Sequence, residues 1–484
     1  MKYLILLLSV IALIQTSTVH AETSDASSYY PKGAACVIRD DSGQVLFVQN
    51  YLSDTLSLPG GFIQNGEDYR RAAERETFEE TGLKVNVGSQ LAINDYRVIY
   101  ACQTETQHSY FYPNLSQYYY GNVVPVFNAP HYAKEIRQVF LLPLTIKVLS
   151  AYQYPDDVDL LIQWLKQTPT SNFTQQQNQT VEPNSLIQTQ LSWISELQSL
   201  AQNFALIKSV LHISVWLSDT VIVFITLAIV FVTLPLKYSA TMTFALVLSS
   251  YSANLLTLLF EVPRPFYVVP SLQNAVAVGY GFPSIKLAIS SAMVGMLLSW
   301  LNHNGRCSKI AAIMSWLVVV IFASLAMVWL GIHYPADVVA GSILGGLATV
   351  ISTLLFNMNN HHNEPIIESR RLWLFMLFVC LYGVYEMIQP FYTYLWFAVL
   401  GILSSLILSQ FAPSITEEEL HIHWPRVLIS FLGLAALIAI PPVITSPTDS
   451  AAFILLSHAF TIWLCIIWLL VASPVLANLL KRSP

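Results

Sequence analysis

The sequence predicts a soluble α/β domain outside the membrane, followed by an all-α polytopic membrane domain. Hydrophobic residues make up 54% of the 484-residue chain and charged residues only 11%, a balance too apolar for an ordinary soluble protein. The charged residues concentrate between residues 30 and 170, whereas long apolar stretches follow one another after residue 211. A net charge of only −6 and the lack of basic clusters argue against nucleic acid as a partner.

Residues 1–21 are typical of a secretory signal peptide. Lys2 precedes an apolar core of about twelve residues, and a polar stretch with small residues ends at Ala21. Because this core is too short to span a membrane comfortably, we expect cleavage after Ala21 and export of the domain that follows. If the segment is instead retained as an anchor, Lys2 still keeps the N-terminus inside and the next domain outside.

Nine apolar stretches are candidate membrane spans, at residues 213–235, 240–260, 284–301, 311–331, 337–356, 372–389, 391–410, 427–446 and 452–479. With an exported N-terminal domain, an odd number of spans places the C-terminus in the cytoplasm. The loops assigned to the cytoplasm carry most of the cations, as the positive-inside rule requires. The predicted location is a bacterial inner membrane, with the soluble domain in the periplasm. The last four spans, within residues 372–479, match no known motif.

Residues 169–211 are expected to connect the two domains. The segment 169–188 is polar and rich in Gln, Asn and Thr, which is typical of a linker. Residues 189–211 are amphipathic and predict a helix lying on the outer membrane face. Cys36 and Cys102 are the only cysteines of the predicted exported domain. A disulfide between them suits that compartment, but the sequence does not decide it.

A predicted helix in the soluble domain presents three carboxylates on one face. Glu76, Glu79 and Glu80 stand at positions i, i+3 and i+4. Carboxylates so arranged repel one another unless a cation lies among them. A hard cation such as Mg²⁺ meets that need, with carboxylates on one side and substrate phosphates on the other. For three glutamates alone, a solvated acidic face remains the alternative.

The whole pattern around this helix resembles the box of the Nudix hydrolases. Residues 60–83 read GGFIQNGEDYRRAAERETFEETGL. The glycine and charged positions of the box fall at Gly61, Glu67, Arg75, Glu76, Glu79, Glu80 and Gly82. Thr77 departs from the aliphatic residue usual in the family, and this departure bears on helix packing rather than on the metal face. The resemblance covers about residues 30–168.

This resemblance implies an α/β/α sandwich with a mixed sheet. It also implies hydrolysis of a diphosphate linkage in a nucleoside diphosphate joined to another group. Glu76, Glu79 and Glu80 would bind Mg²⁺ or Mn²⁺, with Glu79 and Glu80 as catalytic residues, and Arg75 would brace the cluster. Substrate choice lies outside the box. The tyrosines of residues 109–122 are candidates for stacking a base, with packing inside the domain as the alternative.

Three polar islands interrupt the outer ends of the predicted spans, at residues 262–265, 282–286 and 331–337. Polar groups gathered at one membrane face favour a functional site. His333 and Asp337 are four residues apart, so the carboxylate can accept one ring N–H and leave the other nitrogen free to attack phosphorus. A purely structural His–Asp pair is the alternative.

Together the islands resemble the three-part signature of the type 2 phosphatidic acid phosphatase superfamily, over residues 212–356. The resemblance implies that Arg264 and Ser284 bind phosphate and that His333 is the nucleophile that forms a phosphohistidine. Asp337 would orient His333. No metal ion is expected at this site.

This chain departs from the signature in all three parts. It lacks the lysine of the first part, the Gly-His of the second and the Ser-Arg of the third. The residues present there are Thr257, Ile285-Lys286 and Ala326-Met327. Lys286 therefore occupies the position of the general acid and is a candidate proton donor and phosphate-binding cation. The alternative is that Lys286 extends to the lipid headgroups and has no role in catalysis. His212 and Asp219 are alternative proton carriers.

The sequence thus predicts a bifunctional membrane hydrolase with a nucleotide-type diphosphate and a lipid phosphate or diphosphate as substrates. A lipid diphosphate is favoured, because its leaving group has a pKa of about 7 and needs less acid assistance than an alkoxide of pKa about 16. The alternative function is a Nudix hydrolase anchored by an inactive phosphatase-like domain that only binds lipid phosphate. Membrane lipids are expected partners, and the oligomeric state is not predicted.

Overall fold

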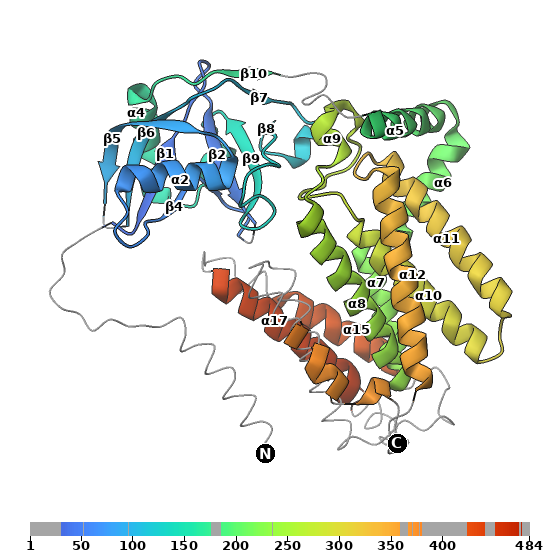
Figure 1. The fold of residues 1–484 in the computed structure, drawn as a ribbon. Helices are drawn as coiled ribbons and strands as arrows, with labels where there is room; N and C mark the ends of the chain where they lie inside the picture. Colours follow the sequence, from blue (N-terminus) through green and yellow to red (C-terminus); the bar gives the residue numbers. More distant parts are fainter. Residues whose placement is uncertain are drawn as a thin grey trace.

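The computed structural model describes residues 31–51, 53–94, 96–175, 185–234, 236–358, 366–369, 371–376, 378–379, 424–440, 451–473 and 476. The predicted signal peptide, the span 391–410 and most of the span 372–389 lie outside these residues. An α/β domain and a bundle of helices make up the described part of the chain (Figure 1).

Two four-stranded sheets form the centre of the α/β domain, in the orders β4-β1-β6-β5 and β3-β2-β9-β8. Their strands are β1 Gly33–Val37, β2 Val45–Asn50, β3 Leu56–Ser57, β4 Gly60–Phe62, β5 Val85–Ile93, β6 Arg97–Thr104, β8 Asn122–Val124 and β9 Ile136–Leu142. The first sheet is mixed, because β1 runs parallel to β6 and antiparallel to β4. Buried apolar residues of both sheets belong to one core cluster, so the domain is the expected α/β fold with a mixed sheet.

Helix α2, Tyr69–Thr81, carries the predicted carboxylates and has clear start and stop signals. The side chain of Asp68 accepts a hydrogen bond from the Arg70 N–H at the N-cap. Gly82 ends the helix with φ 70°, a left-handed conformation that favours glycine, and its N–H donates to the Phe78 carbonyl. Helix α4, Val158–Gln167, buries Leu161 and Trp164 against the domain.

The chain stays attached to this domain beyond residue 168. Strand β10, Phe173–Gln175, pairs in parallel with β7, His108–Tyr110. The Thr104 N–H also donates to the Ser171 hydroxyl at 3.0 Å. The segment expected to begin a linker at residue 169 therefore first adds an edge strand.

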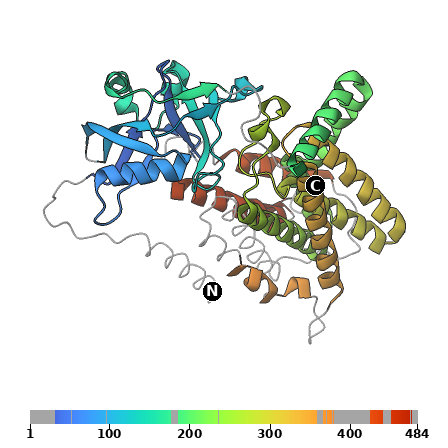
Figure 2. The ribbon, with the colours of Figure 1, turned by 45° about the horizontal axis from the view of Figure 1, so that its top comes forward.

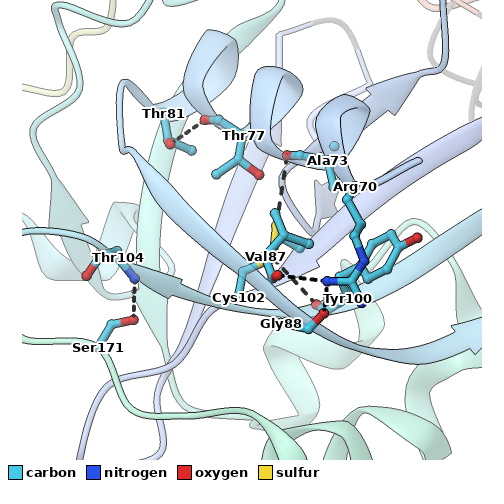
Figure 3. Close-up of a disulfide and its surroundings, with 12 residues drawn as sticks. Arg70, Ala73, Thr77, Thr81, Val87, Gly88, Tyr100, Cys102, Thr104 and Ser171 are labelled. Carbon is cyan, nitrogen blue, oxygen red and sulfur yellow. Dashed lines mark hydrogen bonds between the residues drawn. A yellow bond between two sulfur atoms is a disulfide. The ribbon is translucent and has the colours of Figure 1, made fainter. Parts of the chain in front are cut away.

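Cys36 on β1 and Cys102 on β6 form a disulfide. Figure 3 shows this bridge below helix α2, near Ala73. The two strands are hydrogen-bonded neighbours in the first sheet, so strand pairing brings the two thiols together. This pairing was left open by the sequence.

The helical part contains α5 Ser185–Asn203, α6 Ala205–Val215, α7 Thr220–Thr233, α8 Leu236–Phe260, α9 Pro265–Val268, α10 Ile285–His303, α11 Lys309–Trp329, α12 Pro335–Asn357, α15 Trp424–Ile438 and α17 Ala451–Ile467. Within the described residues, four helices are long and apolar enough to cross a membrane. They are Lys237–Val268, Ile285–His303, Lys309–Trp329 and Pro335–Asn357. The bent pair Ser185–Asn203 and Ala205–Ser218, with an angle of 116°, would make a fifth span.

The nine-span count stays a prediction, and its first span differs from the structure. Residues 213–235 are not one helix, because the Asp219 carboxylate accepts from the Val221 N–H at 2.8 Å and starts a new helix, α7. Helix α7 has 14 residues, which is short for a straight span. The spans predicted at 427–446 and 452–479 overlap α15 and α17, which have 15 and 17 residues.

Small residues bring α10 and α12 into close contact. A Cβ atom at Gly341 would lie 2.4 Å from the Ser284 carbonyl, and one at Gly345 would lie 2.3 Å from the Ala288 carbonyl. Such close approach needs glycine and is typical of helices packed in a membrane. It places the start of α10 beside the start of α12.

Helix α5 lies across this end of the bundle. The Gln198 side-chain amide donates to the carbonyls of Leu272, at 2.8 Å, and Trp329, at 3.0 Å. The predicted amphipathic segment 189–211 thus forms parts of two helices, α5 and α6, with the 116° bend between them.

The α/β domain packs directly on the same end of the bundle, through the segment around α9 (Figures 1 and 2). One apolar cluster continues from the α/β core into the helices and includes Tyr132, Phe266, Tyr267 and Tyr280. The two parts of the chain therefore share buried apolar surface in addition to the covalent connection.

Two candidate active sites

A single guanidinium group organises the carboxylates of α2. Arg75 Nε lies 2.8 Å from Glu67 Oε1, and its Nη1 lies 2.8 Å from both Glu76 Oε1 and Glu79 Oε2. The third nitrogen, Nη2, donates to the Phe62 carbonyl at 2.9 Å. Arg75 therefore offsets the repulsion between the carboxylates and holds them on one face, as a planar donor group can.

Glu76, Glu79 and His131 form a group that could hold a metal ion, with one ligand atom from each lying within 4.8 Å of the others. His131 follows β8 and is fixed by its backbone N–H, which donates to the Glu79 carbonyl at 2.7 Å. Its Nδ1 lies 3.2 Å from Glu135 Oε2. Motif spacing did not select His131, although a histidine four residues before a glutamate is a pattern that could have drawn attention.

Glu80 does not belong to that group of three, which differs from the predicted set of ligands. Its Oε2 accepts a hydrogen bond from the Gly60 N–H at 2.8 Å. Position 80 lies on the more buried side of the helix, where the carboxylate meets the backbone that leads into β4. Glu80 thus links α2 to Gly60, the first residue of β4.

Burial and neighbouring groups shift the pKa values of several side chains at this site. Burial raises the pKa of Glu76 and raises that of Glu80 well above its usual value. The hydrogen bond from Arg75 lowers the pKa of Glu67, and the one to Glu135 raises the pKa of His131. Two carboxylates and one imidazole are a donor set that fits a divalent metal ion.

Gly61 is required by the position of Glu76. A Cβ atom at residue 61 would lie 2.4 Å from Glu76 Oε2, so any side chain there would displace this carboxylate. Thr77, the position that departs from the family pattern, is fully buried. Its hydroxyl has no hydrogen-bond partner among the described residues.

The tyrosines of residues 109–122 are partly packed and partly exposed, and Tyr112 is 57% exposed. Tyr119 and Tyr120 make edge contacts with the Phe140 ring. Tyr118 is 66% exposed. Tyr118, Tyr119 and Tyr120 line a cavity of about 240 Å³ together with other residues from both parts of the chain, among them Arg137, Lys147, Val276 and Val278.

The second site centres on the ring of His333, which is 3% exposed. Its Nδ1 lies 3.0 Å from the Gly281 carbonyl and 3.5 Å from Asp337 Oδ2. A carbonyl oxygen only accepts, so Nδ1 carries the proton and Nε2 presents a lone pair. Nε2 lies 3.1 Å from Ser284 Oγ and 3.4 Å from Arg264 Nη1. Burial lowers the pKa of His333, which favours the neutral, nucleophilic ring.

Backbone carbonyls orient Arg264. Its Nε donates to the carbonyls of Val278 and Gly279, both at 3.1 Å, and its Nη1 donates to that of Ile332 at 2.8 Å. Asp337 Oδ2 accepts from the Tyr334 N–H at 2.8 Å. The structure therefore brings residues from all three polar islands together at one end of the bundle.

Lys286 is not among the residues that contact His333. Its side chain is exposed, and its ammonium makes no hydrogen bond or ion pair with any residue that the structure describes. The two alternative proton carriers, His212 and Asp219, do not contact His333 either. The His212 ring contacts Trp329, and Asp219 caps α7.

The positions where the signature lacks a cation are buried. The Thr257 hydroxyl donates to the Ala253 carbonyl at 2.8 Å within α8. Ala326 and Met327 are 0% and 2% exposed, and Met327 belongs to the apolar core. Within the described part of the chain, Arg264 is the cationic side chain in contact with His333.

A carboxylate-rich helix in an α/β domain and a histidine–serine–arginine group at the end of a helical bundle define a two-domain protein of the hydrolase class. Residues 29–157 match the NUDIX domain model, and residues 238–361 match the PAP2 superfamily model. The chain therefore contains a NUDIX domain followed by a PAP2 superfamily domain. NUDIX domains generally use a divalent metal ion, in agreement with the donor set around Glu79.

Individual relatives resemble parts of the chain. A Bacillus subtilis (strain 168) protein whose name assigns it 8-oxo-dGTP diphosphatase activity is 33% identical over 64 residues. This match covers 13% of the present chain and 43% of the relative, so the chain spans less than half of that relative's length.

Solved structures of three proteins are also similar. An ADP-ribose pyrophosphatase from Streptococcus suis 89-1591 is 18% identical, covering 30% of this chain and 100% of that one, with a TM-score of 0.21. A UDP-X diphosphatase is 17% identical, covering 34% and 75%, with a TM-score of 0.23. A NUDIX hydrolase from Nitrosomonas europaea is 15% identical, covering 32% and 84%, with a TM-score of 0.21.

Proposed function

We propose that the NUDIX domain hydrolyses a diphosphate linkage in a nucleotide-type substrate with the help of a divalent metal ion. The observation that carries this proposal is the grouping of Glu76, Glu79 and His131, braced by Arg75. These three residues would hold Mg²⁺ or Mn²⁺, which when bound polarises phosphate oxygens and activates water. Glu80 remains a candidate for metal binding or proton transfer on the same helix.

We further propose that the PAP2 domain releases phosphate from a lipid phosphate or diphosphate. Nε2 of His333 would attack phosphorus, forming an N–P bond while the P–O bond to the leaving group breaks. Water would then hydrolyse the phosphohistidine and release phosphate. Arg264 and Ser284 would contact the phosphate oxygens, while Gly281 and Asp337 hold the Nδ1–H.

A lipid diphosphate suits this site better than a monoester. Within the described residues, Nε2 of His333 contacts Ser284 and Arg264 but no histidine or carboxyl group that could act as a general acid, so a leaving group of low pKa is favoured. Lys286 would supply a second phosphate contact or a proton once substrate is bound. The alternative function is a PAP2 domain that binds lipid phosphate without hydrolysis and anchors the NUDIX domain.

We place the NUDIX domain in the periplasm of a bacterium, with the helical part in the inner membrane and the C-terminus in the cytoplasm. The Cys36–Cys102 disulfide supports this placement, because structural disulfides are typical of oxidising compartments. The lipid site at the same end of the bundle would then also face the periplasm.

The NUDIX activity is tested by Glu79→Gln in the purified full-length protein, with nucleoside-diphosphate-linked compounds as substrates. We expect turnover to fall by about 100-fold or more, because one metal ligand loses its charge. Glu74→Gln is the matched control, since Glu74 lies exposed on the same helix. Full activity of Glu79→Gln, or indifference of the wild type to EDTA, would contradict the proposal.

The lipid activity is tested separately by phosphate release from a panel of lipid phosphates and diphosphates. His333→Ala should abolish it while nucleotide hydrolysis continues. His303→Ala, at the other end of α10, is the control. If the wild type releases no phosphate from any lipid of the panel, the anchoring alternative replaces the phosphatase proposal.

A further inference from the structure

The segment Val278–Gly281 lies between the NUDIX domain and the side chains of the PAP2 site. On the PAP2 side, its carbonyls accept hydrogen bonds from both functional groups. Arg264 Nε donates to Val278 and Gly279, and His333 Nδ1 donates to Gly281. The position of this short segment therefore sets the orientation of Arg264 and His333.

On its other side, the same segment is bound by the NUDIX domain. The Gly279 N–H donates to Tyr132 Oη at 3.1 Å, and Tyr280 Oη donates to the Phe127 carbonyl at 3.0 Å. Gly279 has φ 72°, so it adopts a left-handed conformation that favours glycine. Two residues of the α/β domain thus hold the backbone on which the PAP2 side chains rest.

Tyr132 belongs to a complete chain of buried hydroxyl groups. Its Oη donates to Tyr267 Oη at 2.7 Å, and Tyr267 Oη donates to Gln138 Oε1 at 3.2 Å. Each of the two hydroxyls therefore accepts one hydrogen bond and donates one, and the chain of donors starts at the Gly279 N–H. Tyr132 and Tyr267 are each 1% exposed, so water has little access to replace a lost hydroxyl.

The rest of the loop before α10 is bound to the NUDIX domain as well. The Gln273 side-chain amide donates to Tyr119 Oη at 2.7 Å, and that of Asn114 donates to the Ser271 carbonyl at 3.0 Å. Between α9 and α10 this loop has only one short 3₁₀ turn, Pro270–Leu272. Its shape therefore depends on the domain that it contacts.

We propose that Tyr132 of the NUDIX domain is a positioning residue of the PAP2 site, acting through Gly279 on Arg264 and His333. The inference rests on the proposed phosphate-binding role of that site. Tyr132 directly follows His131 of the candidate metal group, so one short loop of the NUDIX domain reaches both candidate sites. The PAP2 site is complete only when the NUDIX domain is docked.

Tyr132→Phe in the full-length protein tests the proposal, since it removes only the hydroxyl. Hydrogen exchange in the peptide containing Val278–Gly281 should become about tenfold faster, the effect of losing one hydrogen bond. Modification of His333 by diethyl pyrocarbonate, followed by peptide mass spectrometry, should also become faster. Neither readout requires the PAP2 site to be active.

Binding of inorganic phosphate and the rate of lipid diphosphate hydrolysis give the functional readout. We expect phosphate affinity to fall about three- to tenfold in Tyr132→Phe, in line with one lost hydrogen bond. Tyr96→Phe is the control, because Tyr96 is 76% exposed and lies in the same domain. Tyr280→Phe removes the second bond to the segment and should act in the same direction, which covers the case that Tyr132→Phe folds poorly.

Wild-type levels of exchange and of His333 modification in both variants would overturn the proposal. Failure of the proposed phosphatase function would show in the wild-type protein. If the wild type neither binds phosphate nor hydrolyses any lipid substrate, the phosphatase role is wrong, while exchange and His333 modification still decide whether Tyr132 positions the site.

Discussion

Thr77 is a buried hydroxyl on the helix that carries the metal group, at a position where an aliphatic residue is usual in the family. Its Oγ1 has no hydrogen-bond partner among the described residues. The neighbouring Thr81 is different, because its hydroxyl donates to the Thr77 carbonyl at 2.5 Å and accepts from the Leu83 N–H at 3.2 Å. The two threonines therefore form a matched pair.

Thr77→Val should raise the free energy of unfolding of the NUDIX domain by about 1 kcal/mol, because an unsatisfied buried hydroxyl is removed without a change of shape. Thr81→Val should lower it by about the same amount. Thermal unfolding of the two variants and the wild type measures both effects. A destabilised Thr77→Val would show that this hydroxyl has a partner in solution.

Lys286 is the residue whose position in the motif and whose position in the structure suggest different roles. The motif places it at the position of an acid, whereas its side chain is exposed and does not contact His333. If substrate phosphate is its partner, Lys286→Ala should lower lipid diphosphate turnover at least about tenfold, the usual effect of a charged hydrogen bond.

Lys286→His should preserve that turnover or extend it to monoesters, since an imidazole is the better proton donor near pH 7. Lys237→Ala is the control, because the Lys237 ammonium lies over the Phe356 ring at the other end of the bundle. Full turnover of Lys286→Ala in an active enzyme would show that this lysine only extends to the lipid headgroups.

At the scale of elements, the α/β domain is held by pairings between strands that are distant in sequence. The disulfide joins β1 to β6 across 66 residues. A bridge that closes a loop of this length lowers the entropy of the unfolded chain and contributes about 4 kcal/mol in the loop-entropy model. The bridge is therefore a large share of the stability of one domain.

Replacing both Cys36 and Cys102 with Ser should lower the unfolding temperature of the NUDIX domain by many degrees, and reductant should do the same to the wild type. Replacement of Cys307 and Cys465, the free cysteines among the described residues, serves as the control. Thermal unfolding with and without reductant is the measurement. Alkylation of Cys36 or Cys102 in the folded, unreduced protein would contradict the assignment.

At the scale of the whole molecule, the NUDIX domain docks on the end of the bundle that holds the PAP2 site. One topology measurement therefore places both candidate sites. With Cys307, Cys380 and Cys465 replaced, a new cysteine at the exposed Gln107 should react with a membrane-impermeant thiol reagent on intact cells. One at Asn304, in the loop between α10 and α11, should react only after lysis.

A periplasmic reporter fused after Pro484 should stay inactive if the C-terminus is cytoplasmic. The reverse labelling pattern would move both sites to the cytoplasm and remove the proposed export. An active reporter together with labelled Gln107 would instead change the number of spans, because the described residues contain four or five candidates and the prediction has nine.

The sequence by itself determined the features that depend on neighbouring residues. Asp68 and Gly82 mark the start and end of α2, and the helical spacing places Glu76 and Glu79 on one face. Motif spacing was enough to select the polar islands of the PAP2 domain. Helix caps, helical faces and motifs act over a few residues, so a local pattern contains the information that defines them.

Only the tertiary structure decided which distant groups meet. Strand order paired Cys36 with Cys102, the fold brought His131 to Glu79, and domain docking placed Tyr132 against Gly279. These contacts depend on how sheets are ordered and how two apolar surfaces fit together. Such fits arise from packing across the whole chain, and a residue's sequence neighbours do not specify them.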